Sequence, residues 1–201
     1  MEKVQQLVLS MMQTNCYLLK EDGHVLIIDP ASSTNRILSQ LDEQDIVDGI
    51  LLTHGHFDHI GAADMLKKRL HCPVFVHPLD ERLAKDPRID RFGTDIALKS
   101  QVSYYQEGRM NIGPFELEIL HTPGHTDGSV CIGYKHHLFT GDTLFQQSVG
   151  RCDLYSGSDS KLKQSLRLLC ERHPDTLIYP GHGSTTVLMD ELLMNPYLSS
   201  F

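Results

Sequence analysis

The stretch Thr53-His54-Gly55-His56-Phe57-Asp58-His59 places three histidines and one aspartate within six positions. The apolar residues 49–52 before it indicate a strand, and residues 60–66 after it look like the start of a helix. An irregular turn between a strand and a helix lets several side chains converge. Crowded imidazole and carboxylate groups suit Zn²⁺ and its first-row neighbours. The alternative is a polar loop that is merely rich in histidine, since the chain has 12 of them.

Three further segments repeat the pattern of an apolar strand, a turn with glycine, and then a histidine or aspartate. They are His121-Thr122-Pro123-Gly124-His125-Thr126, Phe139-Thr140-Gly141-Asp142-Thr143-Leu144 and Leu177-Ile178-Tyr179-Pro180-Gly181-His182-Gly183. A site built at the ends of several strands requires this repetition, and chance rarely produces it four times. The sequence therefore predicts one metal site assembled from distant segments.

The order of these motifs resembles that of the metallo-β-lactamase-fold hydrolases over residues 26–183: HxHxDH, a histidine, a Gly-Asp pair and a final Gly-His. Within that superfamily, residues 141–145 followed by Gly150-Arg151 are similar to the glyoxalase II (hydroxyacylglutathione hydrolase) group. The chain ends soon after its last motif, so it resembles the short glyoxalase II-like proteins. The resemblance implies an α/β fold, the αββα four-layer sandwich, with helices outside two facing sheets and metals at one edge.

The resemblance also implies how the site is divided between two divalent metal ions. The first ion would be held by His54, His56 and His125. The second would be held by Asp58, His59 and His182, and Asp142 would bridge the two. Zn²⁺ is the expected ion, with Fe or Mn as alternatives. A hydroxide between ions roughly 3.5–4 Å apart can exist near neutral pH, and Asp58 would act as the catalytic residue that aims it.

These features predict a dinuclear metal-dependent hydrolase of a small thioester, S-lactoylglutathione or a related hydroxyacyl thioester. A thioester suits the site because its thiolate leaves without a strong general acid. Arg151 is expected to bind a substrate carboxylate, or else to pair with Asp153 and stiffen its own loop. Asp127, where the family often has proline, would deter an anionic substrate. The alternatives are a persulfide dioxygenase with a single iron, a lactonase, and a metal-stabilised binding scaffold.

Composition limits the remaining possibilities. A length of 201 residues, with 40% apolar and 22% charged, suits a single domain spanning residues 1–201. The net charge of −8 argues against nucleic acid or an anionic membrane as a partner. The first residues show no signal peptide or membrane span. The five scattered cysteines indicate reduced thiols and a cytoplasmic location.

The remaining pattern predicts alternating strands and helices. Strands are expected over 4–9, 15–19, 25–29, 74–76, 102–105, 115–120, 129–133, 138–140 and 176–179. Helices are expected over 33–41, 60–70, 160–170 and 185–194, the first capped by Ser32 or Ser33.

Several side chains outside the motifs receive an expectation too. Asp29 either orients a ligand histidine or is a turn carboxylate. His77 is expected to be structural, and the pair His136-His137 to lie in a solvated turn. Cys152 is not expected to act as a nucleophile. An insertion such as residues 80–100 often forms part of the substrate wall in the superfamily, but the residues themselves do not indicate a role.

Overall fold

The computed structural model describes residues 2–86, 88–89 and 93–199. The first half of the chain forms a six-stranded sheet in the order β1-β2-β3-β4-β5-β6. Its strands are β1 (Lys3–Leu9), β2 (Thr14–Glu21), β3 (His24–Ile28), β4 (Ile46–Leu51), β5 (Val74–Val76) and β6 (Ser103–Tyr104). The first three strands pair antiparallel, whereas β3 to β6 run parallel.

The second half forms another six-stranded sheet in the order β14-β13-β10-β9-β8-β7. Its strands are β7 (Gly108–Ile112), β8 (Phe115–His121), β9 (Val130–Tyr134), β10 (His137–Gly141), β13 (Leu177–Pro180) and β14 (Thr186–Val187). Only the β10–β13 pair of this sheet is parallel. A separate small hairpin consists of β11 (Leu144–Phe145) and β12 (Ser148–Val149).

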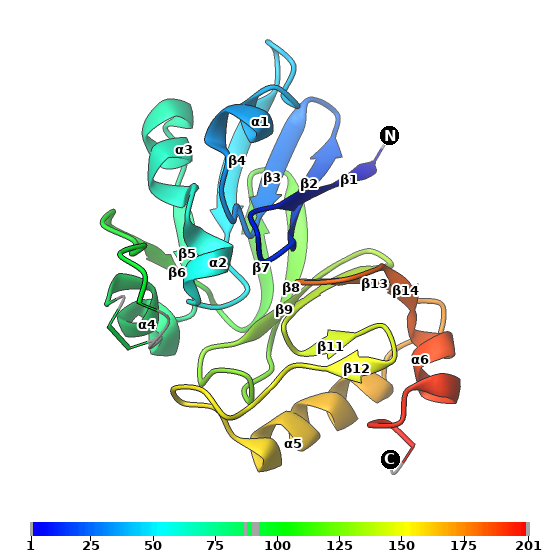
Figure 1. Ribbon diagram of the computed structural model, residues 1–201. Helices are drawn as coiled ribbons and strands as arrows, with labels where there is room; N and C mark the ends of the chain where they lie inside the picture. Colours follow the sequence, from blue (N-terminus) through cyan, green and yellow to red (C-terminus); the bar gives the residue numbers. More distant parts are fainter. Residues whose placement is uncertain (1, 87, 90–92, 200–201) are drawn as a thin grey trace.

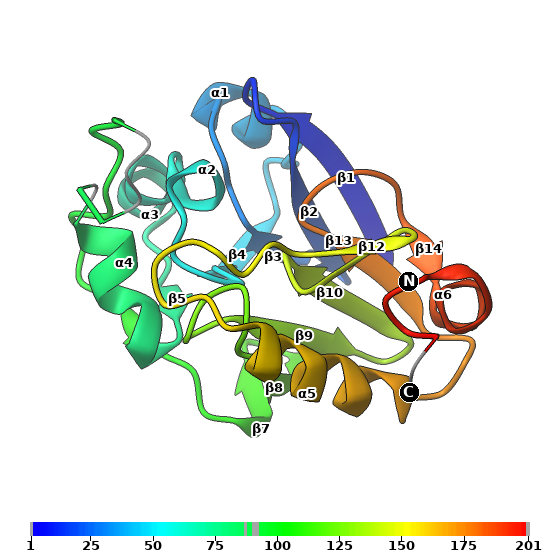
Figure 2. The same ribbon diagram turned by 60° about the horizontal axis from the view of Figure 1, so that its bottom comes forward.

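Helices cover the outer face of each sheet (Figures 1 and 2). The first half contributes α1 (Thr34–Leu38), α2 (Phe57–Ile60), α3 (Ala63–Leu70), the 3₁₀ turn η1 (Pro78–Asp80) and α4 (Glu81–Lys85). The second half contributes α5 (Asp159–Cys170) and α6 (Leu188–Met194), which lie below the second sheet in Figure 1. Among the described residues, no helix has the length and apolar character that a membrane crossing requires.

Alternation along the buried strands separates the core into layers. In β2, Leu18 packs toward the helices of the first half, while Leu19 packs against the second sheet. In β10, Phe139 faces the first sheet and Leu138 packs with the apolar side of α5 and α6. Three apolar clusters therefore separate four layers, which confirms the predicted αββα sandwich of the metallo-β-lactamase fold.

Most predicted elements are present, and the differences have local causes. The helix predicted over 60–70 begins earlier, at Phe57, and is interrupted at Gly61. There the chain passes so close to Ala31 that an added Cβ would lie 2.3 Å from its carbonyl oxygen. Ser33 makes no side-chain cap, because it adopts a left-handed conformation with φ 57°. The strands β7, β11, β12 and β14 were not predicted. β14 occupies the start of the helix predicted over 185–194, which begins at Leu188.

Candidate metal centre

The seven predicted ligands meet at one edge of the two sheets, where their strands end. His54 and His56 follow β4, Asp58 and His59 lie in α2, His125 lies between β8 and β9, Asp142 follows β10, and His182 follows β13. Parallel pairing of β3 with β4 and of β10 with β13 brings carboxyl ends together at this edge, where open α/β sheets bind ligands. The structure thus brings all seven side chains together.

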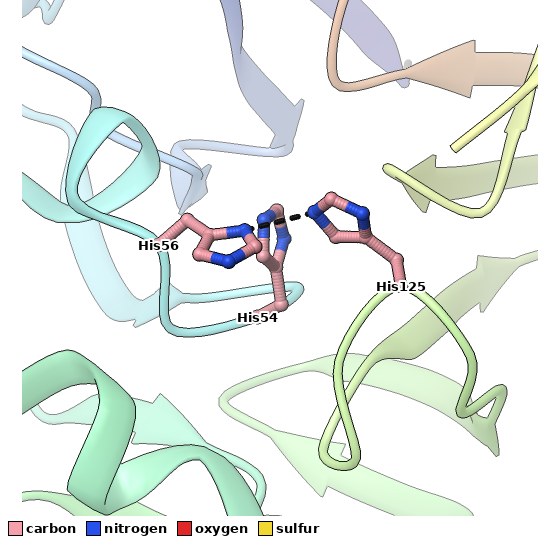
Figure 3. A group of neighbouring side chains, drawn as sticks. All are labelled: His54, His56 and His125. Carbon is pink, nitrogen blue, oxygen red and sulfur yellow. Dashed lines mark hydrogen bonds between the residues drawn. The ribbon is translucent and has the colours of Figure 1, made fainter. Parts of the chain in front are cut away.

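His54, His56 and His125 form a compact set, here called the histidine group (Figure 3). Their ligand nitrogens lie within 4.8 Å of one another, and the three residues are only 1%, 3% and 2% exposed. The distance between His125 Nε2 and His56 Nδ1 is 2.8 Å. Two ring nitrogens that approach this closely cannot both carry a proton, so at least one lone pair points into the group.

Asp58, His59 and His182, here called the carboxylate group, form a second set within the same 4.8 Å limit. His182 Nε2 lies 3.3 Å from Asp58 Oδ2, and His59 Nε2 lies 3.6 Å from the same oxygen. Thr14 Oγ1 donates to Asp58 Oδ2 at 3.1 Å, which holds this carboxylate in place. The histidine nitrogens of this group are therefore close to the Asp58 carboxylate, but these nitrogen–oxygen distances exceed those of ordinary hydrogen bonds.

Asp142 lies between the two groups. Its Oδ1 is 3.4 Å from His59 Nε2, and its Oδ2 is 3.5 Å from His125 Nε2 and 3.6 Å from His182 Nε2. Gly181 packs so tightly here that an added Cβ would lie 2.2 Å from Asp142 Oδ1. The Gly-His motif at the end of β13 thus needs its glycine for contact with the central aspartate.

Hydrogen bonds made on the side of each ring that points away from the centre determine which ring nitrogen faces it. His125 Nδ1 donates to the carbonyl oxygen of Arg151 at 2.7 Å, and His182 Nδ1 donates to that of Met12 at 3.2 Å. A carbonyl oxygen only accepts, so each of these Nδ1 atoms carries the proton. The Nε2 atom of both rings then carries a lone pair that faces the centre, as in metal-binding histidines generally.

The hydrogen bonds of Asp29 support both groups. They decide between the two roles expected for Asp29 in favour of orienting a ligand histidine. Its Oδ2 accepts from His59 Nδ1 at 2.9 Å and from Thr53 Oγ1 at 2.6 Å, and its Oδ1 accepts from Thr53 N at 2.8 Å. Because the Thr53 hydroxyl proton is used, Thr53 Oγ1 accepts from His54 Nδ1 at 3.1 Å. Asp29 therefore orients one predicted ligand directly and another through Thr53.

Asp80 is a supporting residue that the sequence did not single out. It is fully buried and accepts from Gly55 N and Gly128 N at 2.8 Å and from Thr126 Oγ1 at 2.7 Å. These donors belong to the loops that carry His56 and His125. Burial raises the pKa of Asp80, whereas the three donors lower it, with a net upward shift. No local pattern distinguishes Asp80 from the other acidic residues of its segment.

Burial and charge act differently on the two groups. Burial lowers the pKa of His54 well below its usual value and that of His56 to about 3. Burial also lowers the pKa of His59, but the carboxylates of Asp58, Asp142 and Asp29 outweigh it and raise the pKa. For Asp58, burial raises the pKa, yet His59 and His182 bring it down to about 2.

The donor set suits divalent cations. Neutral imidazoles and ionised carboxylates are the ligands that Zn²⁺ and its neighbours accept. His54 Nε2 and Asp142 Oδ1 are buried and have no hydrogen-bond partner within the described part of the chain. Polar atoms left in this way are costly unless a cation binds them. The two ions that the family resemblance implies fit this arrangement of ligand groups.

A cavity of about 410 Å³ opens over these residues. Its lining includes His56, Asp58, His125, Asp142 and His182, the apolar side chains of Met12, Phe57, Phe145, Val149 and Leu154, and Arg151. The Arg151 guanidinium makes two hydrogen bonds to the Asp153 carboxylate, at 2.7 and 2.8 Å. The second expectation for Arg151, pairing within its own loop, is thus the arrangement present.

Among the described residues of the segment 80–100, none lines this cavity. Residues 87 and 90–92 of that segment lie outside the description. The hairpin β11–β12, its following loop and Met12 form the wall instead. Asp127 is paired with Lys161 Nζ at 2.6 Å and does not line the cavity, so its charge is partly neutralised.

Four other histidines and Cys152, which also received expectations or lie near them, do not belong to the ligand set. His77 begins a 3₁₀ turn and stacks on His121, in agreement with a structural position at a strand end. His137 is not in a solvated turn: it is 7% exposed, starts β10, and bonds to the Tyr179 hydroxyl at 3.0 Å. His136 is half-exposed, as expected for the turn. Cys152 is not among the cavity residues.

Comparison with known proteins agrees with this geometry. The family described as the metallo-beta-lactamase superfamily matches residues 10–182. A probable metallo-hydrolase of Bacillus subtilis, YqgX, is 36% identical over 198 residues, 94% of each chain. The hydroxyacylglutathione hydrolase GloC of Haemophilus influenzae is also 36% identical, over 202 residues and 94% of each chain.

Solved structures show the same relationship. The BLEG-1 B3 metallo-beta-lactamase superposes with a TM-score of 0.94 at 35% identity, covering 98% of this chain and 100% of that one. TTHA1623 in a di-iron-bound form gives 0.88 at 35% identity, covering 96% and 100%. ETHE1 from Myxococcus xanthus gives 0.81 at 29% identity, covering 98% and 85%. The chain therefore belongs to the metallo-beta-lactamase superfamily of metallo-hydrolases.

Proposed function

We propose that this chain is a dinuclear metal-dependent hydrolase of a small hydroxyacyl thioester, such as S-lactoylglutathione or a related compound. One observation carries the proposal: the histidine group, the carboxylate group and Asp142 lie together at one cavity, with outer hydrogen bonds that direct ligand atoms inward. The likeness to GloC supports the thioester as the substrate class by analogy.

Each group has a distinct part in this proposal. The histidine group would hold one ion, the carboxylate group the other, and Asp142 would lie between them. The bound ions supply Lewis acidity and lower the pKa of water. Asp58, which accepts a hydrogen bond from Thr14, would accept a hydrogen bond from the attacking water and orient it. Zn²⁺ is the expected ion, and the di-iron form of TTHA1623 supports Fe as the alternative.

The cavity suits a thioester in two respects. Its volume of about 410 Å³ falls within the roughly 300–1,000 Å³ of ordinary ligand pockets. No lysine, tyrosine or cysteine lines it among the described residues, so no obvious strong general acid or protein nucleophile is at hand. A thiolate leaving group requires neither. Arg151, at the cavity rim, would hold a substrate carboxylate if it exchanged Asp153 for the substrate.

Steady-state assays on S-lactoylglutathione and on a lactone test the proposal. The metal-loaded chain should release thiol from S-lactoylglutathione, and it should do so faster than it opens a lactone. Metal removal by a chelator should abolish the activity, and Zn²⁺ should restore it. Lactone opening without thiol release would replace the thioester with a lactone as the substrate.

Persulfide oxidation is the second candidate. It is favoured by the Gly150-Arg151 pair and by the structural likeness to ETHE1. It would require a single iron per chain and consumption of O₂. Oxygen uptake with glutathione persulfide, together with about one iron per chain and no thiol release from the thioester, would overturn the hydrolase proposal.

A further inference from the structure

Of the seven predicted ligands, His182 lies in the most open surroundings. Its side chain is 27% exposed, whereas the other six are at most 12% exposed. It lies in the turn after β13 with a glycine on either side, and Gly183 adopts a φ of 77°. Because glycine restricts the backbone less than any other residue, the local sequence of this turn does not fix the position of His182. Contacts from elsewhere in the chain are therefore needed to hold this ligand.

Asn15, the second residue of β2, bonds to this turn on both sides of His182. The Nδ2 atom of Asn15 donates to the carbonyl oxygen of Pro180 and to that of Gly183, each at 2.9 Å. Its backbone N–H donates to the carbonyl oxygen of Gly181 at 2.8 Å. Asn15 therefore binds the backbone at the two residues before the ligand and at the residue after it.

The partners of the Asn15 amide decide its orientation. A carbonyl oxygen only accepts, so the atom that faces Pro180 and Gly183 must belong to the NH₂ group. On its other side, Asn15 Oδ1 accepts from Gln6 Nε2 at 2.7 Å. Asn15 is 1% exposed, and both protons of its NH₂ group are used in these bonds. A buried amide with these partners is held in one orientation, and an apolar side chain could not replace its bonds.

Strand β2 holds the turn at two further points. The hydroxyl of Tyr17, which is 2% exposed, donates to the carbonyl oxygen of Pro180 at 2.7 Å. Thr14 forms an isolated antiparallel bridge with His182. The start of a strand in the first sheet thus carries a ligand that follows a strand of the second sheet, and Asn15 lies at the middle of these contacts.

We propose that Asn15 is a positioning residue for His182, and through it for the metal ion at the carboxylate group. This role rests on the metal binding of the proposed function and belongs to a residue outside both the ligand set and the cavity lining. Without the amide, the turn is free to shift, and His182 Nε2 leaves its place 3.3 Å from Asp58 Oδ2. The histidine group takes no ligand from this turn, so its ion is held independently of Asn15.

The zinc affinities of the metal-stripped full chain and its variants, measured by competition with a graded chelator, test the proposal. Asn15→Ala should weaken the binding of one ion about tenfold or more, as partners that hold a metal ligand commonly do, and leave the other ion unchanged. His182→Ala identifies the ion concerned, because it should weaken the same one. Thr176→Val is the control: it removes a buried hydroxyl that donates to a carbonyl oxygen at the opposite end of β13, and both affinities should match wild type.

Asn15→Asp separates the hydrogen bonds of the amide from the volume of the side chain. It keeps the size but turns a carboxylate oxygen toward two carbonyl oxygens, so it should weaken the same ion at least as much as Asn15→Ala. If neither variant folds, Tyr17→Phe removes the hydroxyl bond to Pro180 and should weaken that ion as well. Unchanged zinc affinities in the variants that fold, or equal weakening of both ions, would overturn the role of Asn15 alone. A wild-type chain that binds no ion at the carboxylate group would overturn the dinuclear function and this role with it.

Discussion

The histidine group and the carboxylate group lie on either side of Asp142 but differ in burial and in charge. The members of the histidine group are 1–3% exposed, and none of them is acidic. In the carboxylate group, the side chains of Asp58 and His182 are 11% and 27% exposed, and Asp58 is ionised. One side of the centre therefore contains only deeply buried imidazoles. The other side adds a carboxylate and is more exposed at Asp58 and His182, although its His59 is fully buried.

The supports of the two groups differ as well. Asp80 joins the loops of His56 and His125 through buried hydrogen bonds. The carboxylate group is held by Thr14 and by the carbonyl oxygen of Met12, which lies in the hairpin connection between β1 and β2. We expect the ion at the histidine group to exchange more slowly, because its ligands are fixed by a buried network. The ion at the carboxylate group is expected to be the more labile of the two.

Removing Asp142 should have the largest effect, because this residue contacts both groups. Asp142→Ala is expected to lower the hydrolytic rate by about 10³-fold or more and to reduce zinc content at both positions. The measurement is kcat/KM on the thioester together with elemental analysis. His173→Ala, a change at a side chain that is 79% exposed, serves as the control and should keep full activity. An Asp142→Ala protein that retains both ions would contradict the central position of this residue.

Asp29 offers a way to affect both groups from outside the ligand set. Asp29→Asn should weaken zinc binding about 10–100-fold at both positions, since the carboxylate orients His59 directly and His54 through Thr53. Thr53→Val is the matched variant and should weaken the histidine group alone. Competition with a graded chelator measures the two affinities. If both variants weaken the same single ion, the proposed connection between Asp29 and His59 is unimportant.

A change at Asp80 tests the support of the histidine group alone. Asp80→Asn replaces one accepting oxygen with an amide NH₂ that faces donors, so metal-free protein should lose about 1–3 kcal/mol of unfolding free energy. Only the ion at the histidine group should be bound more weakly. Asp64→Asn is the control, because Asp64 also accepts from two backbone N–H groups but lies outside the centre. Urea unfolding and zinc titration of both variants separate stability from metal affinity.

Arg151 should give the smallest effect, because its guanidinium is 57% exposed. If it binds the substrate, Arg151→Ala should raise KM by up to about fivefold, the small effect expected of an exposed ion pair. Asp153→Asn then should lower KM, because it releases the guanidinium. If both variants raise KM equally, the pair serves to stiffen the loop whose Arg151 carbonyl oxygen holds His125.

Local patterns predicted the strands and the ligands for the same reason. A buried strand needs consecutive apolar residues, as in β4 and β9, and a turn at its end needs glycine beside a polar side chain. Both requirements are visible within a few residues. Strands without this contrast, such as the polar Gly108–Ile112, were missed. The close approach that requires glycine at position 61 was missed because its partner, the carbonyl oxygen of Ala31, lies thirty residues away in the chain.

The sequence by itself indicated the fold class and the seven candidate ligands, and the family resemblance implied their division into two groups. These depend on residue type and order, which a linear pattern records. Only the tertiary structure decided which carboxylates support the centre, which residues form the cavity wall, and whether Arg151 has a partner. Such roles depend on side chains that meet across sheets and loops, as Asp80 does with Gly55 and Gly128. Close packing creates these contacts, so no local pattern of residues contains them.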